Sequence, residues 1–264
     1  MEPSATTAGT EPAAAPMSLK EQDAEPIVEI NGLGHSYGAN AVLHGIDLSI
    51  HPGEIFGFLG HNGAGKTTTL HILTTLIAPT TGTARVCGYD VVKERLQVQR
   101  SIGYLPENVR LYDGLTAAEN LRFFAKLSGV DDPSTAVKAT LDFLGCGELA
   151  DRRVGTFSKG MRQRIGIAQA ILHGPRVLFL DEPTSGLDPM GVRQLRETIL
   201  RLNAELGMTI FMNTHLLSEV SRVCTTIGVL GEGVLIYNDS LAKTLERFPD
   251  EASLEGIYVR LDDR

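Results

Sequence analysis

The fold is decided by the stretch Gly60-His61-Asn62-Gly63-Ala64-Gly65-Lys66-Thr67-Thr68. Residues 60–67 fit the phosphate-loop pattern G-x-x-x-x-G-K-[ST]. The apolar run at 54–59 predicts a strand before the loop, and apolar residues at helical spacing after it predict a helix that ends before Pro79. Because a phosphate loop joins a strand to a helix, the sequence predicts a nucleotide-binding site here.

Each part of this loop has a chemical role. Glycines let the backbone turn tightly so that its N–H groups can face phosphate oxygens, and the N-terminus of the helix adds a positive field. We expect Lys66 to reach the terminal phosphates, the Thr67 hydroxyl to bind Mg²⁺, and the stretch through Thr68 to contact the nucleotide. The alternative is a glycine-rich turn with an incidental lysine, which the spacing and the flanking elements disfavour.

A second stretch, Leu178-Phe179-Leu180-Asp181-Glu182, supplies carboxylates at the end of a buried strand. Ligands of parallel α/β sheets bind beyond the carboxyl ends of the strands, which would bring Asp181 toward the phosphate loop. We interpret Asp181 as the Mg²⁺ ligand and Glu182 as the base that orients water. Neighbouring side chains of a strand face opposite ways, so both acids can reach the site only because Pro183 ends the strand. A plain solvated turn is the alternative.

Strands that alternate with helices along the chain indicate an α/β fold. Short apolar runs bounded by Gly and Pro predict strands at 27–30, 41–50, 54–59, 176–180 and 208–213. Helical spacing predicts helices at 116–128, 134–144, 159–172 and 190–206. After these, short strands with turns at Gly231 and Gly233 are expected. The helices between about 107 and 173 predict a helical subdomain that is inserted between strands.

Composition narrows the class of protein further. The chain has 264 residues, 42% of them hydrophobic, and a net charge of −8. These values exclude a collagen, a coiled coil and a wholly disordered chain. The mild acidity, with no basic block, argues against a nucleic-acid partner and against attraction to anionic lipid. The widely spaced Cys87, Cys146 and Cys224 lack metal or redox spacings and suit a reducing compartment.

The N-terminal segment and the hydropathy of the chain indicate where in the cell the protein is expected. Residues 1–26 are rich in Ala, Thr, Pro and Glu, carry five acidic residues against Lys20, and predict a disordered acidic tail. No run approaches the roughly 18 apolar residues of a membrane-spanning helix, and the N-terminus does not fit a secretory signal. If the protein works at a membrane, we expect a partner to hold it there.

Four further segments resemble the motifs of ATP-binding cassette (ABC) proteins, the ATPase subunits of ABC transporters. The stretch Phe157-Ser158-Lys159-Gly160-Met161-Arg162-Gln163-Arg164 resembles the ABC signature segment, and Ser185-Gly186-Leu187-Asp188 resembles the D-loop. The stretch Asn213-Thr214-His215 resembles the switch segment, and Tyr37 stands where the family has an adenine-stacking aromatic. The resemblance covers nearly all of residues 27–262.

The resemblance implies both a fold and an activity. The fold is that of a P-loop NTPase, with a mixed core sheet, an N-terminal antiparallel β subdomain and an inserted helical subdomain. The activity is Mg²⁺-dependent ATP hydrolysis by a homodimer or a pair of ATPase subunits. Ser158 and Gly160 would contact the terminal phosphate of the ATP on the opposite subunit, and Asp188 would touch the partner's site. His215 would sense the phosphate, and Tyr37 would stack on adenine.

Two departures from the family pattern point to a branch. Glu107 stands where most members have Gln, and Lys159 and Met161 stand where many signatures have Gly and Gln. We interpret Glu107 first as a gate or interface residue and second as a metal ligand. These features, with the ending at 252–261, resemble the ABC-2 branch of exporters. Parts of the sequence also resemble the ATPase of the transporter that serves nitrous oxide reductase maturation.

The leading prediction is an ATPase subunit on the cytoplasmic face of the cell membrane that powers a separate polytopic permease, with export favoured by the branch resemblance. The permease is expected to dock near Leu111, Tyr112 and Leu115, beside 151–154, although ordinary packing also explains these residues. The runner-up is a soluble ABC ATPase that acts on a non-membrane partner. A metabolic kinase or GTPase is disfavoured by the signature segment and by the lack of a guanine-reading Asn-Lys-x-Asp motif.

Overall fold

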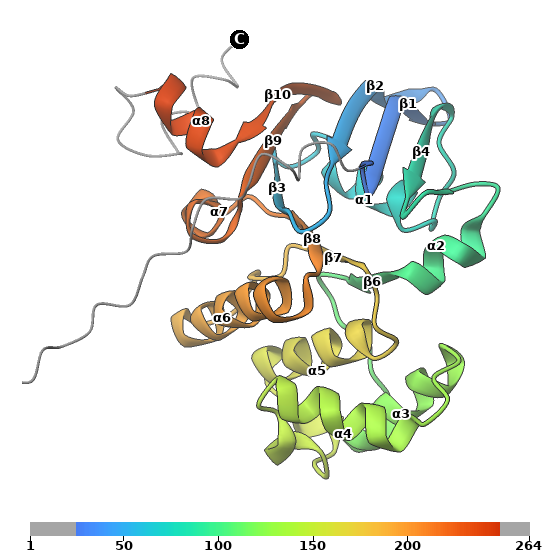
Figure 1. The fold of residues 1–264 in the computed structure, drawn as a ribbon, viewed down its shortest axis with the longest axis vertical. Helices are drawn as coiled ribbons and strands as arrows, with labels where there is room; N and C mark the ends of the chain where they lie inside the picture. The colour runs from blue at the N-terminus through green and yellow to red at the C-terminus, as the bar shows by residue number, and fades with distance from the viewer. Residues whose placement is uncertain (1–24, 249–264) are drawn as a thin grey trace, which may run out of the picture.

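Two sheets form the centre of the molecule (Figure 1). The structure is a computed structural model that describes residues 25–248. The smaller sheet is antiparallel and has the order β2-β1-β4-β5. Its strands are β1 (Val28–Tyr37), β2 (Asn40–Ile50), β4 (Thr81–Val86) and β5 (Tyr89–Asp90).

The larger sheet has six strands in the order β10-β9-β3-β8-β7-β6. Strands β9, β3, β8, β7 and β6 are parallel, and β10 joins the edge antiparallel. The strands are β3 (Ile55–Leu59), β6 (Ile102–Leu105), β7 (Val177–Asp181), β8 (Thr209–Asn213), β9 (Thr226–Gly231) and β10 (Val234–Ser240). All residues of β3, β7 and β8 are buried, because both faces of this parallel sheet are covered.

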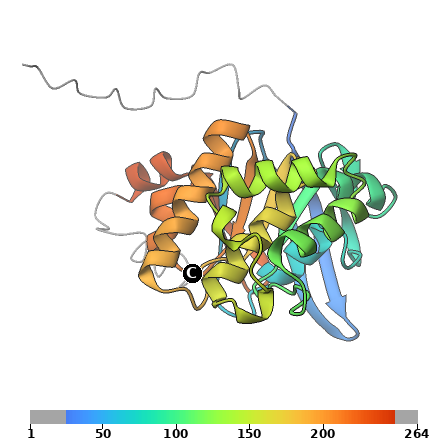
Figure 2. The ribbon, with the colours of Figure 1, turned by 90° about the horizontal axis from the view of Figure 1, so that it is seen from below.

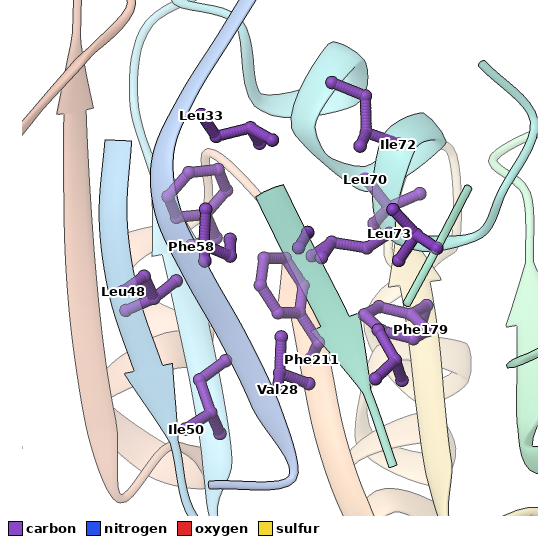
Figure 3. Packing of buried hydrophobic residues seen from close by; sticks show 14 of the residues in the cluster. Val28, Leu33, Leu48, Ile50, Phe58, Leu70, Ile72, Leu73, Phe179 and Phe211 are labelled. Carbon is purple, nitrogen blue, oxygen red and sulfur yellow. The ribbon is translucent and has the colours of Figure 1, made fainter. Parts of the chain in front are cut away.

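Alternate residues of the parallel strands contribute to two separate cores, as the two-residue period of a strand requires. On one face Phe56, Phe58, Phe179 and Phe211 pack under the antiparallel sheet and helix α1 (Lys66–Leu73), with ring centroids of Phe58 and Phe211 5.3 Å apart (Figure 3). On the other face a second apolar cluster joins the same strands to helices α5, α6 and α7. The strand ends are therefore held rigidly from both sides.

The remaining helices lie around these sheets. They are α2 (Arg95–Ser101), α3 (Ala117–Leu127), α4 (Pro133–Phe143), α5 (Lys159–Ile171), α6 (Pro189–Leu206), α7 (Leu217–Val223) and α8 (Leu241–Arg247). Short 3-10 turns cover Gly147–Leu149 and Val154–Thr156. Helices α3, α4 and α5 lie together at the end of the molecule away from the antiparallel sheet (Figures 1 and 2), around an apolar cluster of their own.

The predicted fold class is confirmed, and the differences from the sequence-based expectations are local. Strand β1 continues to Tyr37, beyond the predicted 27–30. Helix α1 ends at Leu73 rather than near Pro79, because Thr75 takes a left-handed φ of 64° and its N–H donates to the Ile72 carbonyl. Helices α2, α7 and α8 were not predicted; each has seven residues, a length at which tertiary packing decides.

Several expectations are not tested by this structure. The acidic tail lies outside the described residues except for its last two positions, and the ending at 252–261 lies wholly outside them. The boundaries of the ATPase domain and of the helical subdomain at about 107–173 stay predictions. In the part that the structure describes, none of the helices combines the length and the apolar character needed to cross a membrane.

Candidate functional site

The phosphate loop connects the end of β3 to the start of α1, as the sequence predicts. Gly63 and Gly65 have left-handed φ values of 88° and 105°, which favour glycine. A Cβ at Gly65 would come within 2.5 Å of Leu43 Cδ2, and a Cβ at Gly60 within 2.5 Å of the Leu230 carbonyl oxygen. Larger residues would therefore displace the loop from the strands that position it.

Lys66 lies across its own loop. Its Nζ donates to the Gly60 carbonyl over 2.6 Å and to the His61 carbonyl over 3.1 Å, and the residue is 6% exposed. Burial lowers the pKa of the Lys66 ammonium, and the nearby Glu182 and Asp181 carboxylates partly offset this effect. The loop thus carries a positive group that is already held beside two acidic side chains.

An open pocket of about 450 Å³ lies over this loop. It is lined by Tyr37, Asn40, Val42, Asn62, Gly63, Gly65, Lys66, Thr67, Thr68, Glu107 and Glu182. The Tyr37 side chain is half exposed at the end of β1 and meets the His35 ring edge to face, with ring centroids 4.6 Å apart. The structure therefore brings together residues from five separate segments, most of which the sequence had singled out.

The remaining members of the predicted loop contribute indirectly. Gly60 and His61 supply the carbonyls that hold Lys66, and the His61 ring itself contacts the Asn62 carbonyl at 2.9 Å. Ala64 is fully buried, and its N–H donates back to the His61 carbonyl. These residues shape the loop from behind rather than line the pocket.

Three oxygen-bearing side chains meet beneath the loop. Asn213 Nδ2 donates to Asp181 Oδ1 over 2.6 Å and lies 3.5 Å from Thr67 Oγ1. Asn213 Oδ1 is buried and lacks a hydrogen-bond partner, and Asp181 is 7% exposed. Carboxylate and hydroxyl oxygens are hard donors that suit Mg²⁺, which takes only one or two carboxylates and completes its shell with water and phosphate. Asp181 and Thr67 therefore fit the predicted metal, while Asn213 turns its amide nitrogen toward them and positions them by hydrogen bonds.

Asn213 was missed as a site residue by the sequence analysis, which used it only within the switch segment. A signal for it did exist. The adjacent parallel strands β7 and β8 place Asp181 directly opposite Asn213, so both side chains leave the sheet at the same edge. Two parallel strands that both end in a polar residue would have pointed to this pair.

Glu182 lies just beyond β7 with an unusual backbone. Its φ of 45° is in the left-handed region, which costs about 1–3 kcal/mol for a residue with a side chain. Its N–H donates to the Asn213 carbonyl over 2.9 Å, and its Oε2 lies 2.8 Å from His215 Nδ1. The side chain of Glu182 is 15% exposed and that of His215 is 53% exposed. The sharp turn places the Glu182 carboxylate at the pocket, and the more exposed His215 imidazole contacts that carboxylate.

Glu107 also faces the pocket. Its Oε1 accepts a hydrogen bond of 3.0 Å from the Ser185 hydroxyl, which belongs to the segment that resembles the D-loop. This bond joins the segment after β6 to the segment after β7. Both roles expected for Glu107, first as a gate or interface residue and second as a metal ligand, stay predictions.

Three predicted nucleotide contacts lie away from this pocket. Ser158 is exposed and caps α5, where its hydroxyl accepts from the Met161 N–H over 3.3 Å, and Gly160 follows in the first turn. Asp188 caps α6 and accepts from the Gly191 N–H over 2.7 Å. The structure does not bring these residues to the Lys66 of the same chain.

The environment of Asp181 yields a first prediction. Burial raises the pKa of this carboxyl, while the hydrogen bond from Asn213 acts in the opposite direction. The folded protein therefore binds this proton more tightly than the unfolded chain does, so stability falls as the pH rises through the raised pKa. Asp181→Asn removes the charge and keeps the shape. We expect it to raise the midpoint of thermal unfolding without nucleotide by about 2–4 °C at pH 7, the shift that about 1 kcal/mol produces.

Thermal unfolding of both proteins between pH 5 and pH 8 checks this expectation. The gain should shrink as the pH falls toward the ordinary aspartate value, because the wild-type carboxyl then takes up its proton. A variant that melts below the wild type at pH 7 would contradict the view that the Asp181 charge is retained for binding at a cost in stability.

A glycine loop at a helix N-terminus, a buried lysine on it and two acids at the end of β7 define a nucleotide-binding protein of the P-loop class. The family model described as ABC transporter matches residues 43–185. The bacitracin transport ATP-binding protein BcrA of Bacillus licheniformis is 40% identical over 80% of this chain and 68% of its own length. The chain belongs to the ABC transporter family and is an ATP-binding subunit.

Two further comparisons agree with this assignment. The linearmycin resistance ATP-binding protein LnrL of Bacillus subtilis (strain 168) is 37% identical over 80% of this chain and 68% of its own length. The solved structure of cbiO1 from Clostridium perfringens, described as part of the ABC transporter complex cbiONQ, is 26% identical. It covers 90% of this chain and 100% of its own, with a TM-score of 0.76.

Proposed function

We propose that this chain binds Mg²⁺-ATP, hydrolyses it, and thereby powers a separate membrane permease of the ABC-2 exporter type. The observation that carries the proposal is that Lys66 and Glu182 line one pocket, with His215 in contact with Glu182 and with Asp181 close enough to act on the charge of Lys66. The names of BcrA and LnrL, which refer to bacitracin transport and linearmycin resistance, support a role in the movement of small molecules out of the cell.

The geometry gives each residue of the pocket a task. Lys66 and the N–H groups of the loop bind the terminal phosphates, and Thr67 and Asp181 hold Mg²⁺. When bound, Mg²⁺ neutralises phosphate charge during transfer of the terminal phosphoryl group. Glu182 accepts a hydrogen bond from the attacking water and orients it, and His215 holds the terminal phosphate from the other side. Tyr37 offers its exposed ring to the adenine.

A second subunit completes the site in this proposal. Ser158 and Gly160 stand at the N-terminus of α5, where unpaired N–H groups favour phosphate, yet they lie outside the pocket of their own chain. Two copies facing each other, with ATP between the phosphate loop of one and α5 of the other, would use both parts. Asp188 would then lie at the interface. Hydrolysis would let the pair reopen.

The exposed aromatic residues of the helical region are the proposed permease contact. Tyr112 and Phe123 are 52% and 40% exposed, and their rings meet edge to face with centroids 5.3 Å apart. The backbone of Tyr112 is held by Asn120, which accepts from the Tyr112 N–H over 2.8 Å and donates to its carbonyl over 3.1 Å. The buried side chain of Asn120 thus holds the backbone that carries the exposed Tyr112 ring. The neighbouring Leu111 and Leu115 are half buried.

Tyr112→Glu is expected to uncouple transport from ATP hydrolysis. A carboxylate at this exposed position would be desolvated by an apolar partner, whereas the ATP pocket lies elsewhere in the chain. We expect basal ATPase activity within about twofold of wild type and a loss of permease co-purification on the order of tenfold, as about 1.4 kcal/mol of binding produces. Tyr89→Glu, at another exposed tyrosine, is the matched control. Loss of folding by Tyr112→Glu alone would instead indicate a packing role.

The partner itself tests the proposed function. Native membranes are solubilised in mild detergent, the protein is recovered through a C-terminal tag, and proteins present at equal stoichiometry are identified. A polytopic membrane protein is the expected result, and it would support the transporter assignment. A soluble partner, or recovery from the cytosol alone, would overturn the transporter assignment and leave the ATP site standing.

A further inference from the structure

A buried glutamine joins helix α5 to the turn that carries Glu182. Gln163 lies one turn beyond the start of α5 and is 3% exposed. Its Nε2 donates a hydrogen bond of 3.0 Å to the carbonyl of Pro183, the residue directly after Glu182. Gln163 does not line the pocket over the phosphate loop, and its hydrogen bond reaches the site through this turn.

The left-handed backbone at Glu182 needs such support. A residue with a side chain keeps a φ of 45° only where its surroundings fix it. The Glu182 N–H donates to the Asn213 carbonyl over 2.9 Å, and the Glu182 carbonyl accepts from the Ser185 N–H over 3.0 Å. Both bonds join backbone groups, so they do not depend on which side chains these residues carry. Among these three hydrogen bonds of the turn, only the bond from Gln163 to Pro183 uses a side chain.

We propose that Gln163 is a positioning residue for Glu182, because it ties the orientation of the Glu182 carboxylate to the position of helix α5. This inference rests on the proposed function, in which Glu182 orients water and the N-terminus of α5 meets the ATP of the opposite subunit. A second contact also joins α5 to the turn after β7, because the side chain of Lys159, at the start of α5, lies next to Gly186. A shift of α5 on engagement of the opposite ATP is thereby passed to Glu182 of its own chain.

Gln163→Met in the full-length chain tests the inference. Methionine keeps the size of the side chain and removes the donor. A misplacement of about 1 Å can cost about 10²-fold in rate, so we expect kcat to fall by about 10-fold to 100-fold, with ATP affinity and KM within about twofold of wild type. Gln99→Met is the matched control, because Gln99 Nε2 donates to Thr75 Oγ1 over 2.8 Å at a partly buried site. Its kcat should stay within about twofold of wild type.

The double variant Glu182→Gln with Gln163→Met separates positioning from general damage. If Gln163 acts through Glu182, the double variant has the kcat of Glu182→Gln alone. Multiplied losses, or a kcat for Gln163→Met no lower than that of Gln99→Met, would overturn the inference. Gln163→Leu is measured alongside, so that the result does not depend on the folding of one variant. Full activity of Glu182→Gln would instead refute the proposed base.

Discussion

Glu182→Gln is expected to lower the kcat for ATP hydrolysis on the order of 10²-fold or more and to leave ATP affinity within about threefold of wild type. The glutamine keeps the length of the side chain and offers its amide to His215, so the turn after β7 should retain its shape. It cannot accept a proton or hold water as a carboxylate does. The loss should therefore appear in kcat and not in binding.

Glu232→Gln is the matched control for this variant. Glu232 lies in the turn between β9 and β10 with a φ of 44°, nearly the same left-handed backbone as Glu182, but it is exposed and does not line the pocket. The same chemical change in the same kind of backbone should thus be silent there. Steady-state hydrolysis and equilibrium ATP binding are measured for both. Full activity of Glu182→Gln would remove Glu182 from the mechanism.

The central part of the fold was predictable because it obeys strong local rules. Strands β3, β7 and β8 have apolar interiors, as strands buried on both faces do, with polar residues only at the ends of β7 and β8, and the glycine pattern fixes the turn that follows β3. The short helices α7 and α8 were not predictable, since packing on the sheets stabilises them more than their own sequence does. The early end of α1 depends on the left-handed Thr75, a residue type that carries no such signal.

The parts of the site that lie within single sequence motifs were predictable. Lys66, Thr67 and Glu182 belong to such motifs and line one pocket, and Asp181, directly before Glu182, is buried and bonded to Asn213. The position of Asn213 between Asp181 and Thr67 depends on which strands are neighbours, which composition and periodicity do not encode.

Hydrogen bonds between segments that are distant in the sequence could not be predicted either. The bond from Ser185 to Glu107 and the bond from Gln163 to Pro183 join segments that are far apart in the chain. The first partner is set by the pairing of β6 with β7, and the second by the position of α5 beside the turn after β7. The motifs therefore identify the groups that do chemistry, and the fold determines how these groups are held.

Lys66→Met is expected to abolish tight ATP binding as well as hydrolysis. Each hydrogen bond to a charged group contributes about 1.5–3 kcal/mol, and an ammonium between two phosphates makes at least two of them. Since about 1.4 kcal/mol changes an equilibrium constant tenfold, we expect affinity to fall by about 10²-fold or more. Without nucleotide the variant should melt within about 2 °C of wild type, because the lost bonds to Gly60 and His61 are offset by the removal of a buried charge.

Thermal unfolding with and without ATP tests the loss of ATP binding separately from the stability of the nucleotide-free protein. At an ATP concentration 100 times the wild-type Kd, the bound nucleotide stabilises the wild type by about 2.7 kcal/mol, whereas a variant with 100-fold weaker binding gains about 0.4 kcal/mol. Lys93→Met, at a lysine whose side chain is 82% exposed, should respond to ATP as the wild type does. An ATP-induced shift of Lys66→Met as large as that of Lys93→Met would contradict the role of Lys66. The hydrogen bonds of wild-type Lys66 to the Gly60 and His61 carbonyls would then serve only to stabilise the loop.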